Sequence, residues 1–349
     1  MIKITRYHLL PLALALPLLW VGGCKKMLPT DVDPFSPKAT YTTTTFMPIL
    51  GRTTVFTGIF NPDNSGLPFN FKIVNVRTAD GHPSDAPTKK MPVLVWKKGY
   101  TGQEKTVAEI EAKREMEEHP LWEVRPKSGE FILWQMADSL LLKQQPDSGY
   151  LFDVEVRNSG GGKDFKNLRL MPYRMQAYSP YEFDQVTGIQ KTETDGNITQ
   201  LFYNHPGLSN VISAATEKGI RPIDTRVYFH KVGDGNTLSF KFLDKDSAVI
   251  DPAKFNLTKW DELLHGFNKK QTPEKVTYDV AFPIPLVKLI TKYTTGDGAS
   301  AQVVFGYNRI GYGGIRQDAY ISYAFNLYQK GDWEMVIHFT KDNPKFEND

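Results

Sequence analysis

Residues 319–328 (AYISYAFNLY) and 333–339 (WEMVIHF), joined through the turn residues Lys330-Gly331-Asp332, decide the fold class. In the first segment, large apolar side chains alternate with small or polar ones, at Ile321, Tyr323, Phe325 and Leu327. The second segment repeats this alternation at Met335, Ile337 and Phe339. A period of two is typical of a strand with one buried face, so both segments are predicted strands.

Patterns of the same kind recur along the chain. They predict strands at residues 69–73, 91–96, 131–134, 150–157, 226–232, 237–243, 288–293 and 301–307. Gly233-Asp234-Gly235-Asn236 is strong turn chemistry and predicts a hairpin between the two strands that flank it. Many short strands separated by turn signals predict a mainly β fold, in the form of two β-sandwich domains of Ig-like character.

Residues 106–118 carry the clearest helical signal. Thr106 and Glu109 form a capping box, and Pro120 ends the segment. Three consecutive glycines at residues 160–162 are costly inside a regular element, and they predict a domain boundary. The predicted domains are therefore residues 46–160, which contain the one short helix, and residues 163–349.

The N-terminus has the pattern of a secretory signal peptide. Lys3 and Arg6 precede an apolar run at residues 9–20, and small residues stand directly before Cys24. The run is shorter than the roughly 20 apolar residues that a transmembrane helix needs. Residues 1–23 are therefore a predicted signal peptide that is removed from the mature chain.

The single cysteine extends this prediction to a lipid anchor. Cys24 occupies the position of the acylated residue in a bacterial lipobox, so it is the predicted lipidation site and would tether the protein to the membrane. The alternative is an ordinary signal peptide that happens to be followed by a cysteine. Residues 24–45 are rich in proline and threonine and are predicted to form an extended tether.

Charge and motif content exclude several classes of protein. Forty-two basic against 39 acidic residues give a net charge of +3, which excludes a strongly basic nucleic-acid-binding protein. One cysteine excludes a disulfide framework. The seven histidines never fall at metal-ligand spacing, and neither a nucleophile elbow nor a phosphate loop occurs. We therefore predict no enzymatic activity, no cofactor and no metal.

Two weaker chemical patterns stand beside this prediction. Residues 61–66 (NPDNSG) place oxygen-bearing side chains as a calcium loop does, but Lys72 stands where such a loop has a glutamate, which favours a plain turn. Glu182 and Asp184 would share one face of a strand and so offer the two carboxylates that a glycosidase needs. Most pairs of that kind are solvated surface residues.

Aromatic residues make up 12% of the chain, and those in turn-rich segments predict sugar binding. Tyrosine rings offer a face on which a sugar can stack, and planar polar side chains form paired hydrogen bonds with hydroxyls. The predicted binding residues in the loop 307–318 are Tyr307, Asn308, Arg309, Tyr312, Arg316 and Gln317. A second cluster contains Tyr173 and Tyr178, with Arg174, Gln176 and Tyr181 around them. The alternative is that these tyrosines pack at sheet edges and corners.

Several motifs resemble a Bacteroidota lipoprotein family of unknown function. They are the lipobox with its lysine-rich continuation (CKKMLP, residues 24–29), LGRTT at residues 50–54, LPFNFKI at 67–73 and the segment that begins YTGQEK at 100. Such lipoproteins resemble the accessory components of SusC/SusD-type importers, which hold glycans at the cell surface. The resemblance implies anchoring in the outer membrane, although Lys25 and Lys26 stand where surface-exported members carry acidic residues.

The same resemblance implies a modification. Asp138-Ser139-Leu140 and Asp246-Ser247-Ala248 look like the three-residue O-glycosylation pattern of that phylum, so Ser139 and Ser247 are predicted acceptors.

Together these observations predict a non-enzymatic, lipid-anchored protein of the outer membrane that binds a polysaccharide or oligosaccharide for a SusC/SusD-type importer. The alternative is a structural or adhesive surface protein that pairs with other proteins through an exposed sheet edge. A long, unprotected terminal strand at residues 333–339 would favour this second function.

Overall fold

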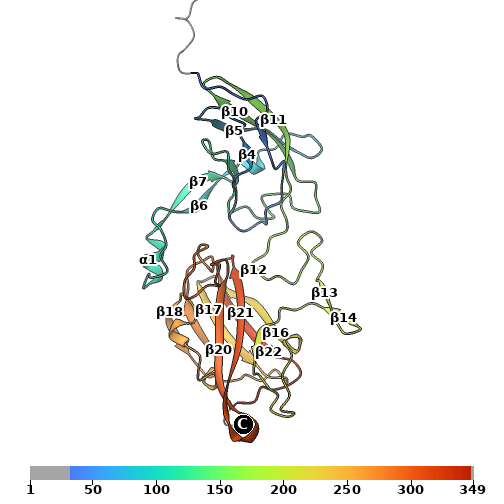
Figure 1. The fold of residues 1–349 in the computed structure, drawn as a ribbon, viewed down its shortest axis with the longest axis vertical. Coiled ribbons are helices and arrows are strands. Elements are labelled where there is room, and N and C mark those ends of the chain that lie inside the picture. Colours follow the sequence, from blue (N-terminus) through green and yellow to red (C-terminus); the bar gives the residue numbers. More distant parts are fainter. Residues whose placement is uncertain (1–31, 347–349) are drawn as a thin grey trace, which may run out of the picture.

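Two lobes are stacked along the long axis of the computed structural model, which describes residues 32–346 (Figure 1). Each lobe has its own hydrophobic core, one built from residues 41–170 and the other from residues 211–346. We refer to residues 32–170 as the upper lobe and to residues 178–346 as the lower lobe. The predicted signal peptide and Cys24 lie outside the described residues.

Two small sheets and a strand pair form the body of the upper lobe. The larger sheet has the order β2-β11-β10-β5 and contains β2 (Thr45–Phe46), β11 (Gly161–Leu170), β10 (Tyr150–Asn158) and β5 (Asn70–Thr78). The second sheet contains β3 (Thr54–Phe56), β9 (Phe131–Leu133) and β8 (Trp122–Val124). The remaining pair is β1 (Thr40–Tyr41) with β4 (Phe60–Asn61), and η1 (Ala86–Thr88) is a single turn.

Aromatic rings from both sheets fill the upper core. Trp122 and Phe131 are stacked with their centroids 5.0 Å apart, and Phe152 meets both rings edge to face. Phe46 contacts the same group at 4.8 Å from Phe131. Rings of this size contribute much of the burial that holds short strands together.

A long hairpin leaves the upper lobe and reaches the lower one (Figure 1). It consists of β6 (Lys90–Trp96), α1 (Val107–Glu111) and β7 (Arg114–Pro120), and we refer to it as the arm. The predicted capping box is present, since Thr106 Oγ1 accepts a hydrogen bond from the backbone N–H of Glu109. The predicted helix at 106–118 is nevertheless wrong beyond Glu111, because residues 114–120 pair with β6 and satisfy its backbone groups.

The lower lobe contains two facing sheets. The five-stranded sheet has the order β16-β22-β17-β19-β18, with β16 (Thr225–Gly233), β22 (Asp332–Phe339), β17 (Thr237–Leu243), β19 (Lys275–Asp279) and β18 (Phe267–Gln271). The other sheet has β21 (Arg316–Leu327) at its centre, beside β20 (Ala301–Ile310), β12 (Tyr178–Ser179) and β15 (Gly207–Ser209). The hairpin of β13 (Thr192–Asp195) and β14 (Ile198–Leu201) projects from the side (Figure 1).

Short helical turns connect these strands. They are η2 (Pro222–Asp224), η3 (Pro252–Lys254), η4 (Trp260–Glu262) and η5 (Tyr312–Gly314). Rings from the two sheets meet in the lower core, with Phe240 and Phe305 at 5.4 Å and Phe229 and Phe325 at 5.5 Å. The alternation that predicted the strands is confirmed here, because each of its large apolar residues is buried: Ile321, Tyr323, Phe325, Leu327, Met335, Ile337 and Phe339. The mainly β fold is therefore confirmed.

The last strand lies in the middle of its sheet. β22 is antiparallel to β16 and parallel to β17, so it separates the two strands that were predicted to form a hairpin. That hairpin prediction is wrong, because the segment 233–236 crosses the start of β22. Asp332 holds the crossing: its carboxylate accepts hydrogen bonds from the backbone N–H groups of Gly235 and Thr237 and from the Thr237 hydroxyl, at 3.0, 3.2 and 2.8 Å.

Three further sequence predictions are corrected. Gly160 lies in the turn of the β10–β11 hairpin and Gly161 and Gly162 begin β11, with Asn158 opposite Gly161, so the boundary after residue 160 falls inside the upper lobe. Part of the predicted tether belongs to the upper lobe as well, since Tyr41 is buried in its core. Residues 288–293 form bends and turns rather than a strand, and their segment packs where the arm meets the lower lobe.

The Asp332→Asn variant tests the role of this carboxylate in holding β22. Its amide would point an N–H donor at groups that themselves donate, so the free energy of unfolding at pH 7 should fall by about 1–3 kcal/mol. Hydrogen bonds from Thr237 lower the pKa of Asp332 below its ordinary 3.8. The stabilisation is therefore present above that value and is lost as the pH falls through the lowered pKa.

Chemical denaturation of both proteins at pH 7 and pH 3 measures the effect. Asp234→Asn is the matched control, because the Asp234 side chain is 95% exposed. Equal stabilities of Asp332→Asn and the wild type at pH 7 would contradict this role.

Candidate ligand-binding groove

The first aromatic ring of the predicted sugar-binding loop, that of Tyr307, is not accessible to a ligand. Tyr307 has no exposed surface and packs in the lower core, with Phe255 and Phe346 at 5.7 and 4.6 Å. Strand β20 runs on to Ile310, so Tyr307 continues the buried face of Val303 and Phe305. Stacking of a sugar on Tyr307 is therefore excluded, and this prediction is wrong.

The other residues of that loop have separate places. Asn308 donates to Asp318 Oδ1 at 2.7 Å, and buried Arg309 donates to the carbonyl oxygen of Asn210 at 2.7 Å. Arg316 and Gln317 are exposed at the start of β21. The side chain of Tyr312 lies outside what the structure describes.

The second predicted cluster is divided between the core and the surface. Half-buried Tyr178 is stacked on Phe229 at 4.7 Å, and its hydroxyl donates to Glu182 Oε2 at 2.8 Å. Burial, together with this carboxylate, raises the pKa of Tyr178. Tyr173 is half-buried and its hydroxyl contacts Met47 Sδ at 3.5 Å. Gln176 and Tyr181, by contrast, line a small pocket.

The paired carboxylates proposed for hydrolysis have different surroundings. Glu182 is buried and accepts from Tyr178 and Asn204, and burial raises its pKa. Asp184 accepts from the backbone of Val186 and Thr187 and so shapes a turn. The two groups thus serve local structure.

The remaining predicted positions lie at turns. Asn61 Oδ1 accepts from the backbone N–H of Asp63, and Ser65 Oγ donates to the carbonyl oxygen of Pro62, as in a plain turn. Ser139 and Ser247, the predicted glycosylation sites, are both exposed.

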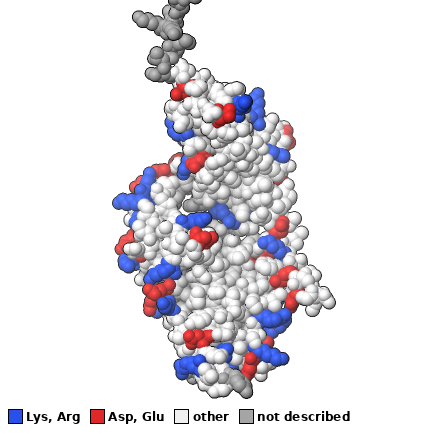
Figure 2. All heavy atoms as spheres, viewed as in Figure 1, with Lys and Arg blue, Asp and Glu red and all other residues white. Residues whose placement is uncertain are grey.

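A groove of about 710 Å³ lies on the upper lobe, a size within the usual range for ligand sites. One wall is the arm, through the ends of β6 and β7, and the other is the body, through β5 and β8. Figure 2 shows acidic and basic side chains interspersed over the visible face, without a large patch of one sign. The overall surface charge therefore does not indicate a ligand, and the lining residues of the groove must be considered one by one.

Tryptophan rings give the groove its stacking surfaces. Trp96 at the end of β6 and Trp134 after β9 are both half-buried, and Trp122 forms part of the floor. The ring of His119 lies 4.8 Å from that of Trp134, and the guanidinium of Arg114 lies over Trp96 at 5.1 Å. The two indole rings are therefore fixed by neighbours rather than free to rotate.

Charged side chains share the lining of the groove with these rings. His119 Nε2 and Nδ1 are each 3.0 Å from a carboxylate, of Glu117 and Glu123 respectively, and Lys97 is paired with Glu117. Burial opposes the protonated ring of His119, but the two carboxylates outweigh it, and the pKa of His119 is raised. Lys97 and His119 lower the pKa of Glu117.

These protonation states bear on what the groove can do. Glycoside hydrolysis requires one carboxyl group that keeps its proton near neutral pH, as a general acid. The lowered pKa of Glu117 opposes that role, so its carboxylate suits hydrogen bonding to hydroxyl groups. Within residues 32–346, no group of three or more metal-binding side chains could hold an ion.

The groove could not be found by local sequence reading. Its indoles come from positions 38 residues apart in the chain, and His119 is followed by a proline, which resembles a turn. The alternation of Glu117 and His119 along β7 was the available signal, but residues 106–118 were assigned to a helix.

The arm that forms one wall is fastened to the lower lobe. Arg114 donates to the carbonyl oxygen of Phe282 at 2.6 Å. His265 Nε2 donates to the carbonyl oxygen of Glu104 at 2.8 Å, so Nδ1 accepts from the hydroxyl of Tyr100. His265 is also stacked on Tyr293 at 5.1 Å. Both lobes thus determine the position of the arm.

The structure defines a mainly β protein with a tryptophan-lined groove. The chain belongs to the family described as Domain of unknown function (DUF5007), which matches residues 60–348. No curated protein and no solved structure matches the chain. Of the helices in the described part of the chain, none has the length and apolar character needed to span a membrane.

His119→Gln tests the charged bridge across the groove, which consists of the contacts of His119 with Glu117 and Glu123. The raised pKa means that the bridge stabilises the fold fully below the ordinary histidine pKa, about 6.5, and less as the pH rises through the raised value. The variant should lose about 1.5 kcal/mol of unfolding free energy at pH 5.5, and less at pH 9. Urea denaturation at both pH values measures this difference. A deficit that is larger at pH 9 would contradict the charged bridge.

Proposed function

We propose that this protein is a non-catalytic, lipid-anchored protein of the bacterial outer membrane that binds a polysaccharide chain in the groove between Trp96 and Trp134. Sugars stack their apolar faces on aromatic rings and present hydroxyls to charged or amide groups. The groove combines both features, because the indoles of Trp96 and Trp134 share its lining with Glu117, His119 and Glu123. This combination is the observation that carries the proposal.

The open form of the site agrees with a polymer as ligand. The groove is bounded by the arm on one side and the body on the other, so a chain can lie across it. Such contacts are wet and individually weak, and a long glycan gains affinity by engaging several units. The two lobes would be two β-sandwich domains, and the glycan would pass to a SusC/SusD-type importer of a Bacteroidota cell.

The structural or adhesive alternative has less support. The strand that was expected to offer an edge, β22, is paired on both sides. One of the two outer strands of the same sheet, β18, carries exposed Lys269 and Lys270, which discourage pairing with another chain. Carbohydrate binding is therefore the better-supported function.

Affinity electrophoresis in gels that contain polysaccharides tests the groove. Trp96→Ala and Trp134→Ala should each weaken retardation roughly tenfold, which corresponds to loss of one stacking contact. Tyr320→Ala, at an exposed ring on the lower lobe, is the matched control and should behave as the wild type. If both tryptophan variants are retarded like the wild type, or no polysaccharide retards the wild type, the proposal is wrong.

The lipid anchor has a separate test. In a cell that processes lipoproteins, Cys24→Ala should remove the acylation site, because the thiol accepts the lipid. The wild type should partition into the detergent phase of a Triton X-114 extract, and the variant into the aqueous phase. A variant that stays in the detergent phase would overturn the anchor.

A further inference from the structure

A second, smaller hollow of about 340 Å³ lies where residues 171–177, which join the two lobes, meet the lower lobe. Two aromatic rings, Tyr181 and Phe202, belong to its lining, together with the polar residues Gln176, Ser179, Gln185, Lys191 and Thr192. Lys191 is the only charged side chain in that lining, and its Nζ donates to the carbonyl oxygen of Tyr181 at 2.8 Å. The pocket is therefore polar and almost neutral.

Gln176 is held in place from both lobes. Its side chain is largely buried, and its Oε1 accepts from Arg52 of the upper lobe at 2.9 Å. The guanidinium of Arg52 lies 4.0 Å over the ring of Tyr328 in the lower lobe. With the oxygen occupied, the amide nitrogen of Gln176 makes no hydrogen bond to the described residues and is a fixed donor at the pocket.

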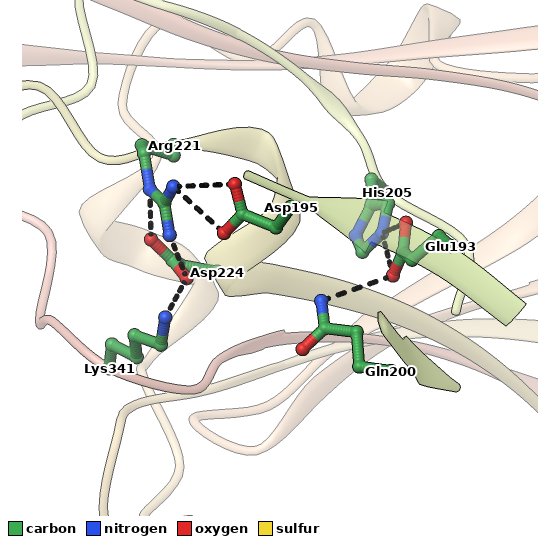
Figure 3. Close-up of polar contacts among 7 residues, drawn as sticks. All are labelled: Glu193, Asp195, Gln200, His205, Arg221, Asp224 and Lys341. Carbon is green, nitrogen blue, oxygen red and sulfur yellow. Dashed lines mark hydrogen bonds and ion pairs between the residues drawn. The ribbon is translucent and has the colours of Figure 1, made fainter. Parts of the chain in front are cut away.

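A charged network lies next to the lining residue Thr192 in the chain (Figure 3). Thr192 begins the β13–β14 hairpin, in which Glu193 meets His205 Nε2 at 2.9 Å and Asp195 meets Arg221 at 3.0 Å. Asp224 forms ion pairs with Arg221 at 2.8 Å and with Lys341 at 2.5 Å. These pairs attach the hairpin to the lower lobe, so the pocket has a preformed wall.

Several polar groups in the pocket have no partner. Within the described part of the chain, the Ser179 and Thr192 hydroxyls and the Gln185 amide form no side-chain hydrogen bond, and the Gln176 amide nitrogen joins them. Neutral amides and hydroxyls beside aromatic rings complement the hydroxyls and C–H faces of an uncharged sugar. Lys191 interacts electrostatically with the buried Glu182, which partly offsets the positive charge of Lys191 and so reduces the attraction of the pocket for an anionic ligand.

We propose that this pocket is a second carbohydrate subsite, selective for a neutral sugar unit and separate from the groove. The inference rests on the proposed carbohydrate-binding function. It adds a ligand class: Gln176 and Gln185 would bind hydroxyls while Tyr181 stacks on the ring, and uronic acids would bind less well.

Isothermal titration calorimetry on the full mature chain tests the subsite. The probes are neutral malto-, cello-, manno- and xylohexaose, with hexagalacturonate as the acidic comparison. At least one neutral probe should bind, and hexagalacturonate should bind more weakly than that probe. Gln185→Ala should weaken the neutral probe roughly fivefold, the loss of one hydrogen bond, and Tyr181→Ala roughly tenfold.

Two controls separate this inference from the groove. Gln302→Ala, at an exposed position on β20, should leave binding unchanged. Trp134→Ala should weaken polysaccharide retardation but leave the pocket's contribution to hexasaccharide binding in place. Adding Gln185→Ala to the Trp134→Ala protein should therefore weaken hexasaccharide binding further. If polysaccharide is retarded through Trp134 while Gln185→Ala and Tyr181→Ala bind every probe like the wild type, the subsite is overturned and the groove stands. If no carbohydrate binds the wild type, both fail.

Discussion

A single buried guanidinium, that of Arg114, joins the parts of this molecule on which the groove depends. It donates to the carbonyl oxygen of Phe282 in the lower lobe, pairs with Glu111 at the end of α1 and lies over the ring of Trp96. Only 8% of the residue is exposed, so the hydrogen bonds of its two terminal nitrogens replace part of the water that the cation has lost, while Nε has no hydrogen-bond partner among the described residues. The contacts of Arg114 therefore fix the arm relative to the lower lobe and position the ring of Trp96.

Both candidate sites share this dependence on contacts between the lobes. Trp96 in the groove lies beside Arg114, and Gln176 in the small pocket is oriented by Arg52, which lies over Tyr328. In each case an arginine of the upper half meets a group of the lower half and fixes a ligand-facing side chain. The relative placement of the lobes is therefore part of the binding geometry.

Local alternation predicted most strands correctly, because the period of two reflects burial of one face and requires only neighbouring residues. Partners in the sheet depend on distant segments, so the position of β22 between β16 and β17 was missed. The helical signal at residues 106–118 was correct for one capped turn, and pairing with β6 then determined the rest. Each error arose where a tertiary contact overrode a local preference.

Tertiary contacts also determine which of the predicted site residues reach a ligand-accessible surface. The residues around Tyr307 have the composition of a sugar-binding loop. Tyr307 nevertheless lies on the buried face of β20, where alternate residues point into the core. Gln176 and Tyr181, from the second predicted cluster, do line a pocket. The groove was missed because Trp96, His119 and Trp134 come together only through the tertiary placement of the arm beside the body of the upper lobe.

Hydrogen exchange followed by mass spectrometry, with and without a polysaccharide that retards the protein, would show whether a glycan occupies the groove. Bound glycan should slow exchange in β6, in β7 and in residues 131–134, the segments that carry the stacking rings and the His119 bridge. Unchanged exchange in all three segments, at a polysaccharide concentration that saturates binding, would contradict the account.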